Sequence, residues 1–301
     1  MITHALSPRR RGLTAAAVAT AAGLLLAACS APDADKRSST TPDPGTGHLH
    51  GLGVDPADNT VYAAGHLGVF RLADGTALRV ADRYQDTMGF TVTGPSTFLG
   101  SGHPSPSDPN ARSPHLGLIR STDAGRTWQT LSAEGEADFH ALEQAGESLY
   151  GFDSQSGKIW ASVDGGRTWD KRAQQPLLDL AAHAENPQQV WAATGKGLET
   201  SSDGGRSFRP VAGAPALVAV DAPEPGLLVG LAADGRVMSS RGGQAWTEQG
   251  RLPAGAKPTV LTAVTGQRLL AADTTDTVYE STDAGRTWMV LHQPSAGAEY
   301  P

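Results

Sequence analysis

The octapeptide STDAGRTW occurs twice in this chain, at 121–128 and at 281–288, and three looser copies lie between them. SVDGGRTW begins at Ser162, SSDGGRSF at Ser201 and the degenerate SSRGGQAW at Ser239, so successive copies start 41, 39, 38 and 42 residues apart. A constant period of about forty residues indicates a repeat architecture in which each repeat is one supersecondary unit. The chain is therefore expected to fold as a series of equivalent units.

The surroundings of the octapeptide indicate what this unit is. Short β-like runs such as FTVTG, TFLGSG and LGLIRS precede the first copy, and TWQTL follows it. Four strands of about five residues in a forty-residue repeat are typical of a β-propeller blade. Counting turns near 72, 121, 162, 201, 239 and 281 predicts an all-β fold, a six-bladed β-propeller over residues 48–293. The strand order predicts whole blades, so closure of the ring would depend on side-chain packing rather than on a shared blade.

The octapeptide itself is predicted to form the hairpin between the third and fourth strands of a blade. Asp123 can accept hydrogen bonds from backbone N–H groups of its turn, Gly125 permits a positive φ, and Trp128 can pack between blades. The pattern S-x-D-x-G-x-T-W resembles the Asp box, or BNR repeat, of sialidases, sortilin-type receptors and photosystem assembly propellers. Because enzymes and non-enzymes share this motif, the resemblance implies a structural role for its aspartates, which here are Asp123, Asp164, Asp203 and Asp283.

The N-terminus predicts export. Three arginines, at 9–11, precede an uncharged run at 13–28 that is short for a membrane span, so residues 1–28 are interpreted as a signal peptide. The sequence LAAC ends at Cys29 and resembles a bacterial lipobox, which implies a lipidated cysteine and a protein anchored at the extracytoplasmic face of the cell membrane. An ordinary signal peptide is the alternative, and the arginines also resemble a twin-arginine export signal.

The tether, the C-terminal tail and the net charge complete the description of the chain, and the charge excludes one class of partner. Residues 29–47 contain no large apolar side chain after Cys29 and are expected to form a flexible tether, while residues 294–301 form a C-terminal tail. Removing the signal peptide, with its three arginines and no acids, changes the formal net charge from −7 to −10. This acidic balance argues against nucleic-acid binding, which requires Lys and Arg to replace counterions.

Polar residues recur at two positions of the repeat that should face the mouth of the central channel. Alignment of the second strands places one set at the entrance of the inner strand: His50, Asp86, Asp138 and Asp179. A second set follows the second strand: His66, His103, Asp153, Lys196, Asp234 and Asp273.

Histidines are concentrated in the first three blades on this predicted face: His48, His50, His66, His103 and His140. Imidazoles with carboxylates suit Zn, Cu, Ni or Fe, and Met88 nearby would favour Cu. We predict a Cu or Zn site built on His48, His50 and His66, with His103 or His140 reaching across. The alternatives are a polar site for an organic ligand, a glycan or a protein, or no specific role. The other histidines of the propeller are expected to be structural, with His183 on the opposite face and His115 and His292 on outer strands.

Two functions remain open. The segments HLHGLGVDP, MGFTV, FLGSGHP and GEADFHAL resemble bacterial secreted propellers labelled glycosyl hydrolase-like or exo-sialidase, a resemblance that implies the fold and no catalytic assignment. No arginine triad of the sialidase type can be assembled, because the arginines occupy repeat positions or the octapeptides. The leading hypothesis is a non-catalytic binding or assembly module. Its rival is a glycoside hydrolase that uses paired carboxylates from Asp86, Asp138, Asp153 or Asp179.

Overall fold

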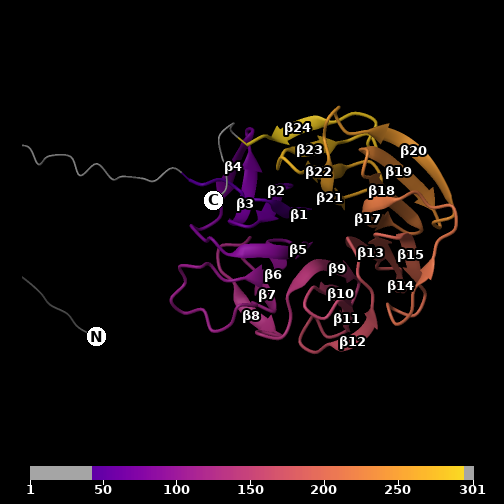
Figure 1. The fold of residues 1–301 in the computed structure, drawn as a ribbon. Coiled ribbons are helices and arrows are strands. Elements are labelled where there is room, and N and C mark those ends of the chain that lie inside the picture. The colour runs from indigo at the N-terminus through magenta and orange to yellow at the C-terminus, as the bar shows by residue number, and fades with distance from the viewer. Residues whose placement is uncertain (1–42, 295–301) are drawn as a thin grey trace, which may run out of the picture. The chain divides into compact units, whose positions relative to one another are not determined.

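Six four-stranded antiparallel sheets surround a central channel in the computed structural model, which describes residues 43–294 (Figure 1). The prediction of an all-β, six-bladed propeller is confirmed. The predicted signal peptide, Cys29 and the last seven residues, 295–301, lie outside the described residues. Within the described part of the chain, no helix has the length and apolar character needed to cross a membrane.

Each blade consists of four consecutive strands, ordered from the channel to the rim. The strands of blades 1 and 2 are β1 (Leu49–Val54), β2 (Val61–Gly65), β3 (Gly68–Ala73), β4 (Thr76–Arg79), β5 (Asp86–Gly94), β6 (Thr97–His103), β7 (Leu118–Ser121) and β8 (Gln129–Ser132). Those of blades 3 and 4 are β9 (Phe139–Ala145), β10 (Ser148–Asp153), β11 (Lys158–Ser162), β12 (Asp170–Gln174), β13 (Asp179–His183), β14 (Asn186–Thr194), β15 (Gly197–Ser201) and β16 (Arg209–Pro210). Those of blades 5 and 6 are β17 (Leu217–Glu224), β18 (Leu227–Ala232), β19 (Arg236–Arg241), β20 (Ala245–Arg251), β21 (Pro258–Ala263), β22 (Leu269–Asp273), β23 (Val278–Ser281) and β24 (Met289–His292).

The hydrophobic core is divided among the contacts between neighbouring blades. Between blades 1 and 2, for example, Tyr62 and Phe90 both pack edge-on against Phe98, with ring centroids 4.8 Å and 5.5 Å away. Five other clusters of buried apolar residues fill the remaining blade contacts in the same way. Burial of apolar surface between the sheets therefore holds the blades together around the ring.

Within residues 43–294, the ring closes between blade 6 and blade 1 without a shared sheet. Leu49 and Leu52 of blade 1 share a buried cluster with Leu270 of blade 6. The Asp276 carboxylate accepts a hydrogen bond from the Leu49 backbone N–H at 2.9 Å. These contacts agree with the predicted closure by packing, and they place the contact between the first and last blades beside the first histidines of the domain.

The octapeptide turns have the predicted hairpin position and hydrogen bonds. In the first turn, Asp123 accepts hydrogen bonds from the Thr127 backbone N–H at 2.9 Å, the Thr127 hydroxyl at 2.7 Å and the Ser121 hydroxyl at 2.8 Å. Gly125, whose φ is +82°, donates its N–H to the Ser121 oxygen at 2.8 Å. The same pattern of aspartate and serine contacts recurs at Asp164, Asp203 and Asp283. These four turns follow the third strands of blades 2, 3, 4 and 6, at the end of the ring opposite the mouth.

The structure differs from the sequence-based boundary at the end of the tether. Thr46 is only 2% exposed, and its carbonyl accepts a hydrogen bond from the Leu67 N–H at 3.2 Å. The Arg79 guanidinium also forms a salt bridge with Asp43. The chain is therefore packed against blade 1 from Asp43 onward, because backbone contacts in this short segment replace the apolar side chains it lacks.

Candidate metal centre at the channel mouth

Bulges in the inner strands aim several side chains at the mouth of the channel. The register of β1 shifts between Leu49 and Gly51, which leaves His50 without a partner on β2. The same displacement leaves Met88 unpaired in β5 and His140 unpaired in β9. A β-bulge turns the extra residue out of the regular alternation of the strand. His50 of blade 1 and His140 of blade 3 thus occupy equivalent bulges at the end of the ring where the channel opens.

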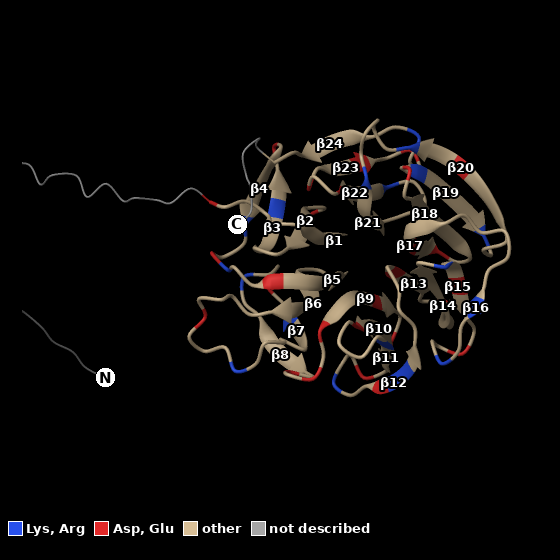
Figure 2. Cartoon of the chain, viewed as in Figure 1, with Lys and Arg blue, Asp and Glu red and all other residues tan. Residues whose placement is uncertain are grey.

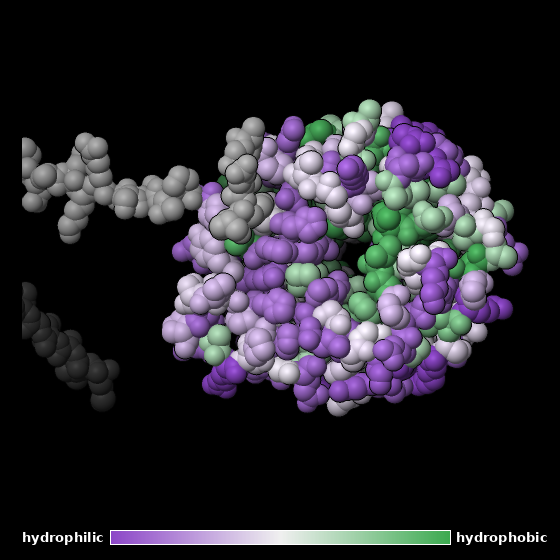
Figure 3. Space-filling view, in the orientation of Figure 1, coloured by the Kyte–Doolittle hydropathy of each residue, from purple (hydrophilic) through white to green (hydrophobic). Residues whose placement is uncertain are grey.

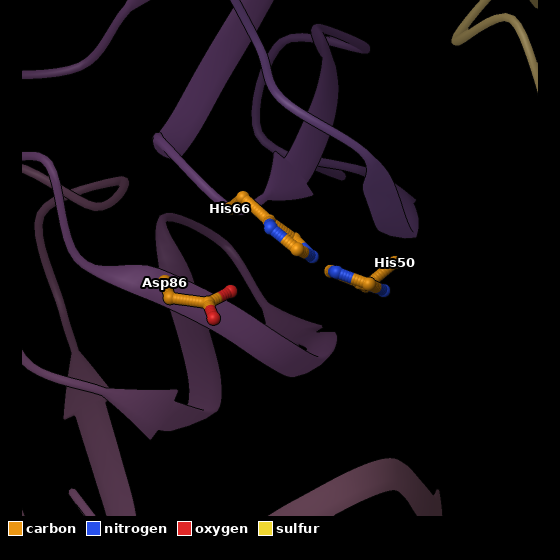
Figure 4. A group of neighbouring side chains, drawn as sticks. All are labelled: His50, His66 and Asp86. Carbon is orange, nitrogen blue, oxygen red and sulfur yellow. The ribbon is translucent and has the colours of Figure 1, made fainter. Parts of the chain in front are cut away.

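The first candidate centre combines two residues of blade 1 with one of blade 2. His50, His66 and Asp86 each offer a ligand atom, and these three atoms lie within 4.8 Å of one another. The rings of His50 and His66 are stacked, with centroids 4.7 Å apart, and Figure 4 shows the Asp86 carboxylate pointing toward the two imidazoles. His66 follows β2 and is exposed, whereas His50 and Asp86 are partly buried. The group is therefore open to solvent at one side.

Two residues of this group each have a side-chain atom without a hydrogen-bond partner among the described residues. His50 Nε2 and Asp86 Oδ1 are both buried within the protein and unpaired. Burial together with the charges of His66, His48 and His140 lowers the pKa of His50 to about 3, so this imidazole is neutral at physiological pH. Burial raises the pKa of Asp86, and the neighbouring Asp138 raises it further, while His66 and His103 oppose the shift. Both unpaired atoms are of the kinds that bind divalent transition metals.

The structure places His48 next to this group, where it has a partner of its own. Its Nδ1 lies 3.2 Å from Asp276 Oδ1, and its ring centroid is 5.2 Å from that of His50. The predicted set of His48, His50 and His66 is thus brought together in blade 1. Asp86, proposed from sequence only as a catalytic carboxylate, completes the group instead of His103 or His140.

His103 and His140 belong to a second group on the same face. His140 Nε2 contacts Asp138 Oδ2 at 2.9 Å, and His103 Nε2 lies 3.6 Å from the same oxygen. His103, His115 and Asp138 also offer ligand atoms within 4.8 Å of one another. Burial would raise the pKa of Asp138, but hydrogen bonds from His140 and Ser154 and the nearby imidazole charges lower it to about 2.

Sequence reasoning missed His115, which it assigned to an outer strand. The structure places it in the segment 104–117 between β6 and β7, with its ring centroid 5.4 Å from that of His103. This insertion follows a second strand, and such loops were already expected at the mouth. The position of the insertion was therefore the signal that could have identified His115. His183 ends β13 at the opposite face, and His292 lies in the outer strand β24, as expected.

The other two candidate catalytic carboxylates have backbone partners. Asp153 is 1% exposed and accepts hydrogen bonds from the backbone N–H groups of Asp138 and Ser156. Asp179 accepts from Leu180 N–H and from Val220 N–H of the next blade, each at 2.9 Å. Asp153 therefore holds the segment that presents Asp138, and Asp179 links blades 4 and 5.

Below the mouth, the inner strands of the blades line a central cavity of about 520 Å³. Three partly buried carboxyl groups face it: Glu143, Asp179 and Asp221. Figure 3 shows hydrophilic residues beside the opening over blades 1 and 2, and hydrophobic residues bordering it over blades 4 to 6. Figure 2 shows acidic and basic residues interspersed along the blades of the described chain. The mouth therefore has one polar, imidazole-rich side and one apolar side.

No protein-family model and no curated protein matches the chain. Among solved structures, YCF48 bound to a D1 peptide is similar at 16% identity and a TM-score of 0.51, with 82% of this chain and 83% of that chain covered. A nidogen/laminin complex is similar at 14% identity and a TM-score of 0.58, with 77% and 93% covered.

Glycoside hydrolase structures share the fold as well. The GH74 xyloglucanase from Xanthomonas campestris is similar at 20% identity and a TM-score of 0.52, with 82% of this chain covered. The chain spans only 45% of that enzyme's length. At these identities the likeness shows a β-propeller fold and leaves the activity of this chain to be argued from its own residues.

Proposed function

We propose that this protein is a non-catalytic binding module that holds a divalent transition-metal ion, Zn(II) or Cu(II), at the mouth of its channel. His50, His66 and Asp86 would be the protein ligands. The observation that carries this proposal is the convergence of one ligand atom from each of the three residues within 4.8 Å, in a group where His50 and Asp86 each also have a buried side-chain atom without a hydrogen-bond partner.

The energetic argument concerns His50 Nε2 and Asp86 Oδ1. A buried polar atom without a partner costs about 1–3 kcal/mol, and unpaired buried atoms are uncommon in native proteins. One metal ion would satisfy both atoms and balance the carboxylate charge. The lowered pKa of His50 supports the proposal, because only the neutral imidazole can donate a lone pair to a metal. The exposure of His66 leaves room for a further ligand from solvent or from a partner.

The molecule that supplies the remaining metal ligands would come from the extracytoplasmic side of the membrane. The lipobox-like sequence at Cys29 supports anchoring at the extracytoplasmic face of the membrane. Two similar propeller structures, YCF48 bound to a D1 peptide and a nidogen/laminin complex, are complexes with a peptide or protein partner. A peptide or protein that contacts the apolar side of the mouth and approaches the metal is the partner that fits this surface.

Glycoside hydrolysis is the second candidate. It is supported by the GH74 structures among the similar folds and by Asp86 and Asp138, two carboxylates close enough to affect each other's ionisation. Each of them, however, faces imidazoles. Hydrolysis of xyloglucan that depends on both aspartates and persists after treatment with a chelator would favour the enzyme over the binding module.

The test of the proposed function is metal stoichiometry. After chelator treatment, the purified protein is titrated with Zn(II) or Cu(II) at neutral pH by calorimetry, and bound metal is measured by elemental analysis. The double variant His50→Ala, His66→Ala should lose one equivalent, with its circular dichroism spectrum unchanged. His183→Ala, which removes an imidazole from the opposite face, is the matched control and should lose none. Unchanged stoichiometry in the double variant would refute the proposal.

A further inference from the structure

A second cluster of potential ligands lies next to the first and shares none of its residues. It consists of His103 at the end of β6, His115 in the insertion before β7, and Asp138 immediately before β9. His140 contacts the same aspartate. These residues come from blades 2 and 3, whereas the proposed ligands His50 and His66 come from blade 1.

The fold holds the three residues in place through their backbones. Leu116 donates its N–H to the Gly102 carbonyl at 2.8 Å, which fixes the end of the insertion beside His103. The His115 carbonyl accepts a hydrogen bond from Gly135 N–H at 3.0 Å, on the segment that leads to β9. Asp138 N–H donates to the Asp153 carboxylate at 2.9 Å. Because each residue is tied to a different part of blades 2 and 3, their proximity is a property of the folded ring.

The hydrogen bond of His103 determines which of its nitrogens is available. Nδ1 lies 2.8 Å from the Pro114 carbonyl, which can only accept, so Nδ1 carries the hydrogen. In the neutral ring, Nε2 then has a lone pair, and it faces Asp138 Oδ2 at 3.6 Å. Oδ2 already lies 2.9 Å from His140 Nε2 and accepts a hydrogen bond from the Ser154 hydroxyl at 2.8 Å, so the lone pair of His103 Nε2 is available to a cation, either a metal ion or a second proton on the ring. A metal-bound histidine commonly donates its other N–H to a backbone carbonyl, as His103 does here.

Two buried side-chain atoms without a protein partner favour the metal over the proton. Asp138 Oδ1 and His115 Nδ1 are buried and make no hydrogen bond, and the side chain of Asp138 is only 2% exposed. A proton on His103 would satisfy the contact with Oδ2 and leave both of these atoms without a partner. A metal ion bound by His103, His115 and Asp138 could satisfy the carboxylate and both imidazoles together.

We infer that His103, His115 and Asp138 form a second, separate site for a divalent transition-metal ion, so that the mouth of the propeller holds two ions. Two nitrogens and one oxygen form a donor set that suits Zn(II), Cu(II) or Fe(II). The inference extends the chemistry of the proposed function to different residues. The two sites adjoin because Asp86 and His103 are partners across β5 and β6.

Stoichiometry in two double variants tests this inference separately from the proposed function. The chelator-treated wild-type protein should bind two equivalents of Zn(II). The variant His103→Ala, His115→Ala and the variant His50→Ala, His66→Ala should each bind one, and the control His183→Ala should bind two. If the wild type binds one equivalent that is lost only with His50 and His66, the second site is refuted and the proposed function remains. If that one equivalent is lost only with His103 and His115, the proposed function is refuted and the second site remains.

A conservative variant and a spectroscopic measurement complete the test. His115→Gln keeps a polar side chain of similar length, so it should fold as the wild type does while lowering the affinity of one equivalent at least tenfold. The ¹⁵N resonances of His103 should shift on addition of the second equivalent of Zn(II). Unchanged His103 resonances, or a doubly protonated ring in the presence of excess Zn(II), would show that a proton occupies this position and would overturn the inference.

Discussion

Asp86 and His103 face each other across β5 and β6, yet each belongs to a different group of potential metal ligands. The pair joins the two groups through one short piece of antiparallel ladder. A change in the spacing of these two strands at the mouth should therefore affect both proposed sites at once, whereas removal of a single imidazole should affect one.

A substitution at Gly102 should alter the spacing between β5 and β6 at the mouth. Its φ is +133°, and a Cβ there would lie 2.2 Å from the Asp86 carbonyl oxygen and 2.9 Å from the Met88 nitrogen. We expect Gly102→Ala to push the two strands apart, to lower stability by about 1–3 kcal/mol, as overpacking does, and to weaken binding of both equivalents of metal. Thermal unfolding and calorimetric titration measure these two effects.

Gly195 offers the matched control for this substitution. It follows the second strand of blade 4, and a Cβ there would meet nothing within 4 Å. Gly195→Ala should leave stability and metal binding unchanged. Normal affinity of both equivalents in Gly102→Ala would contradict the proposed coupling through β5 and β6.

The channel carboxyl groups predict a dependence of stability on pH. Burial raises the pKa of Asp179 to about 8, and the charge of Asp221 adds to the shift while the Val220 and Leu180 N–H groups oppose it. The folded state then binds more protons than the unfolded state between about pH 4 and pH 8, so the free energy of unfolding should fall as pH rises through this window. Asp179→Asn cannot ionise and should lessen this fall, measured as the change in melting temperature between about pH 6 and pH 9.

Asp203→Asn is the control, because Asp203 lies in an exposed turn where hydrogen bonds from Ser207 and Ser201 lower its pKa. It should keep the pH dependence of the wild type, whatever its effect on stability. An identical pH dependence in Asp179→Asn and the wild type would show that Asp179 is ionised throughout, held so by its two backbone donors.

The octapeptide turns should contribute to stability and not to binding. Asp123→Ala removes the acceptor of three hydrogen bonds and should destabilise the fold by about 1–3 kcal/mol, because the donors lose their partner. Metal stoichiometry should not change, since the turn lies at the end of the ring opposite the mouth. Thr122→Ala, at an exposed position of the same turn, is the control. Loss of metal binding without a lower melting temperature would place this turn in the site.

Membrane attachment is expected to depend on Cys29. Cys29→Ser should release the protein from the membrane fraction, or leave it there as an uncleaved precursor, because the thiol that carries the lipid is absent. Metabolic labelling with a fatty-acid analogue and membrane fractionation measure both outcomes. Unchanged labelling in the variant would refute the lipobox interpretation.

The blades could be predicted from sequence because their determinants are local. The octapeptide recurs every forty or so residues, and the short strands around it alternate with turn residues, so strand count and strand order follow from one chain segment at a time. The faces of the ring follow as well, since loops after second strands and turns after third strands lie at opposite ends. This is why His50, His66 and His103 were expected at the mouth, where the structure places them.

The grouping of the ligands could not be predicted in the same way, because it depends on contacts between blades. The ungapped alignment of repeats was wrong to treat His50 and Asp86 as equivalents, because the strand registers place His50 at the same bulge as Met88 and His140. The alignment also gives no distance between residues of different blades. The meeting of His50 and Asp86 depends on the bulge at His50 and on the packing of blade 1 against blade 2. His115 lies in an insertion that has no counterpart in the repeat, so its return to His103 depends on backbone hydrogen bonds that no pattern in the sequence specifies.

Every blade of this ring is one uninterrupted piece of chain, and the first and last blades meet without pairing their strands. An in-frame duplication or deletion of about forty codons would therefore add or remove one complete blade and split no other. In a ring closed by a shared sheet, strands from both ends of the chain must still pair with each other after such a duplication or deletion. Duplication within the gene could thus lengthen the protein by whole blades. All residues of both proposed metal sites lie in the first three blades or in the segments between them.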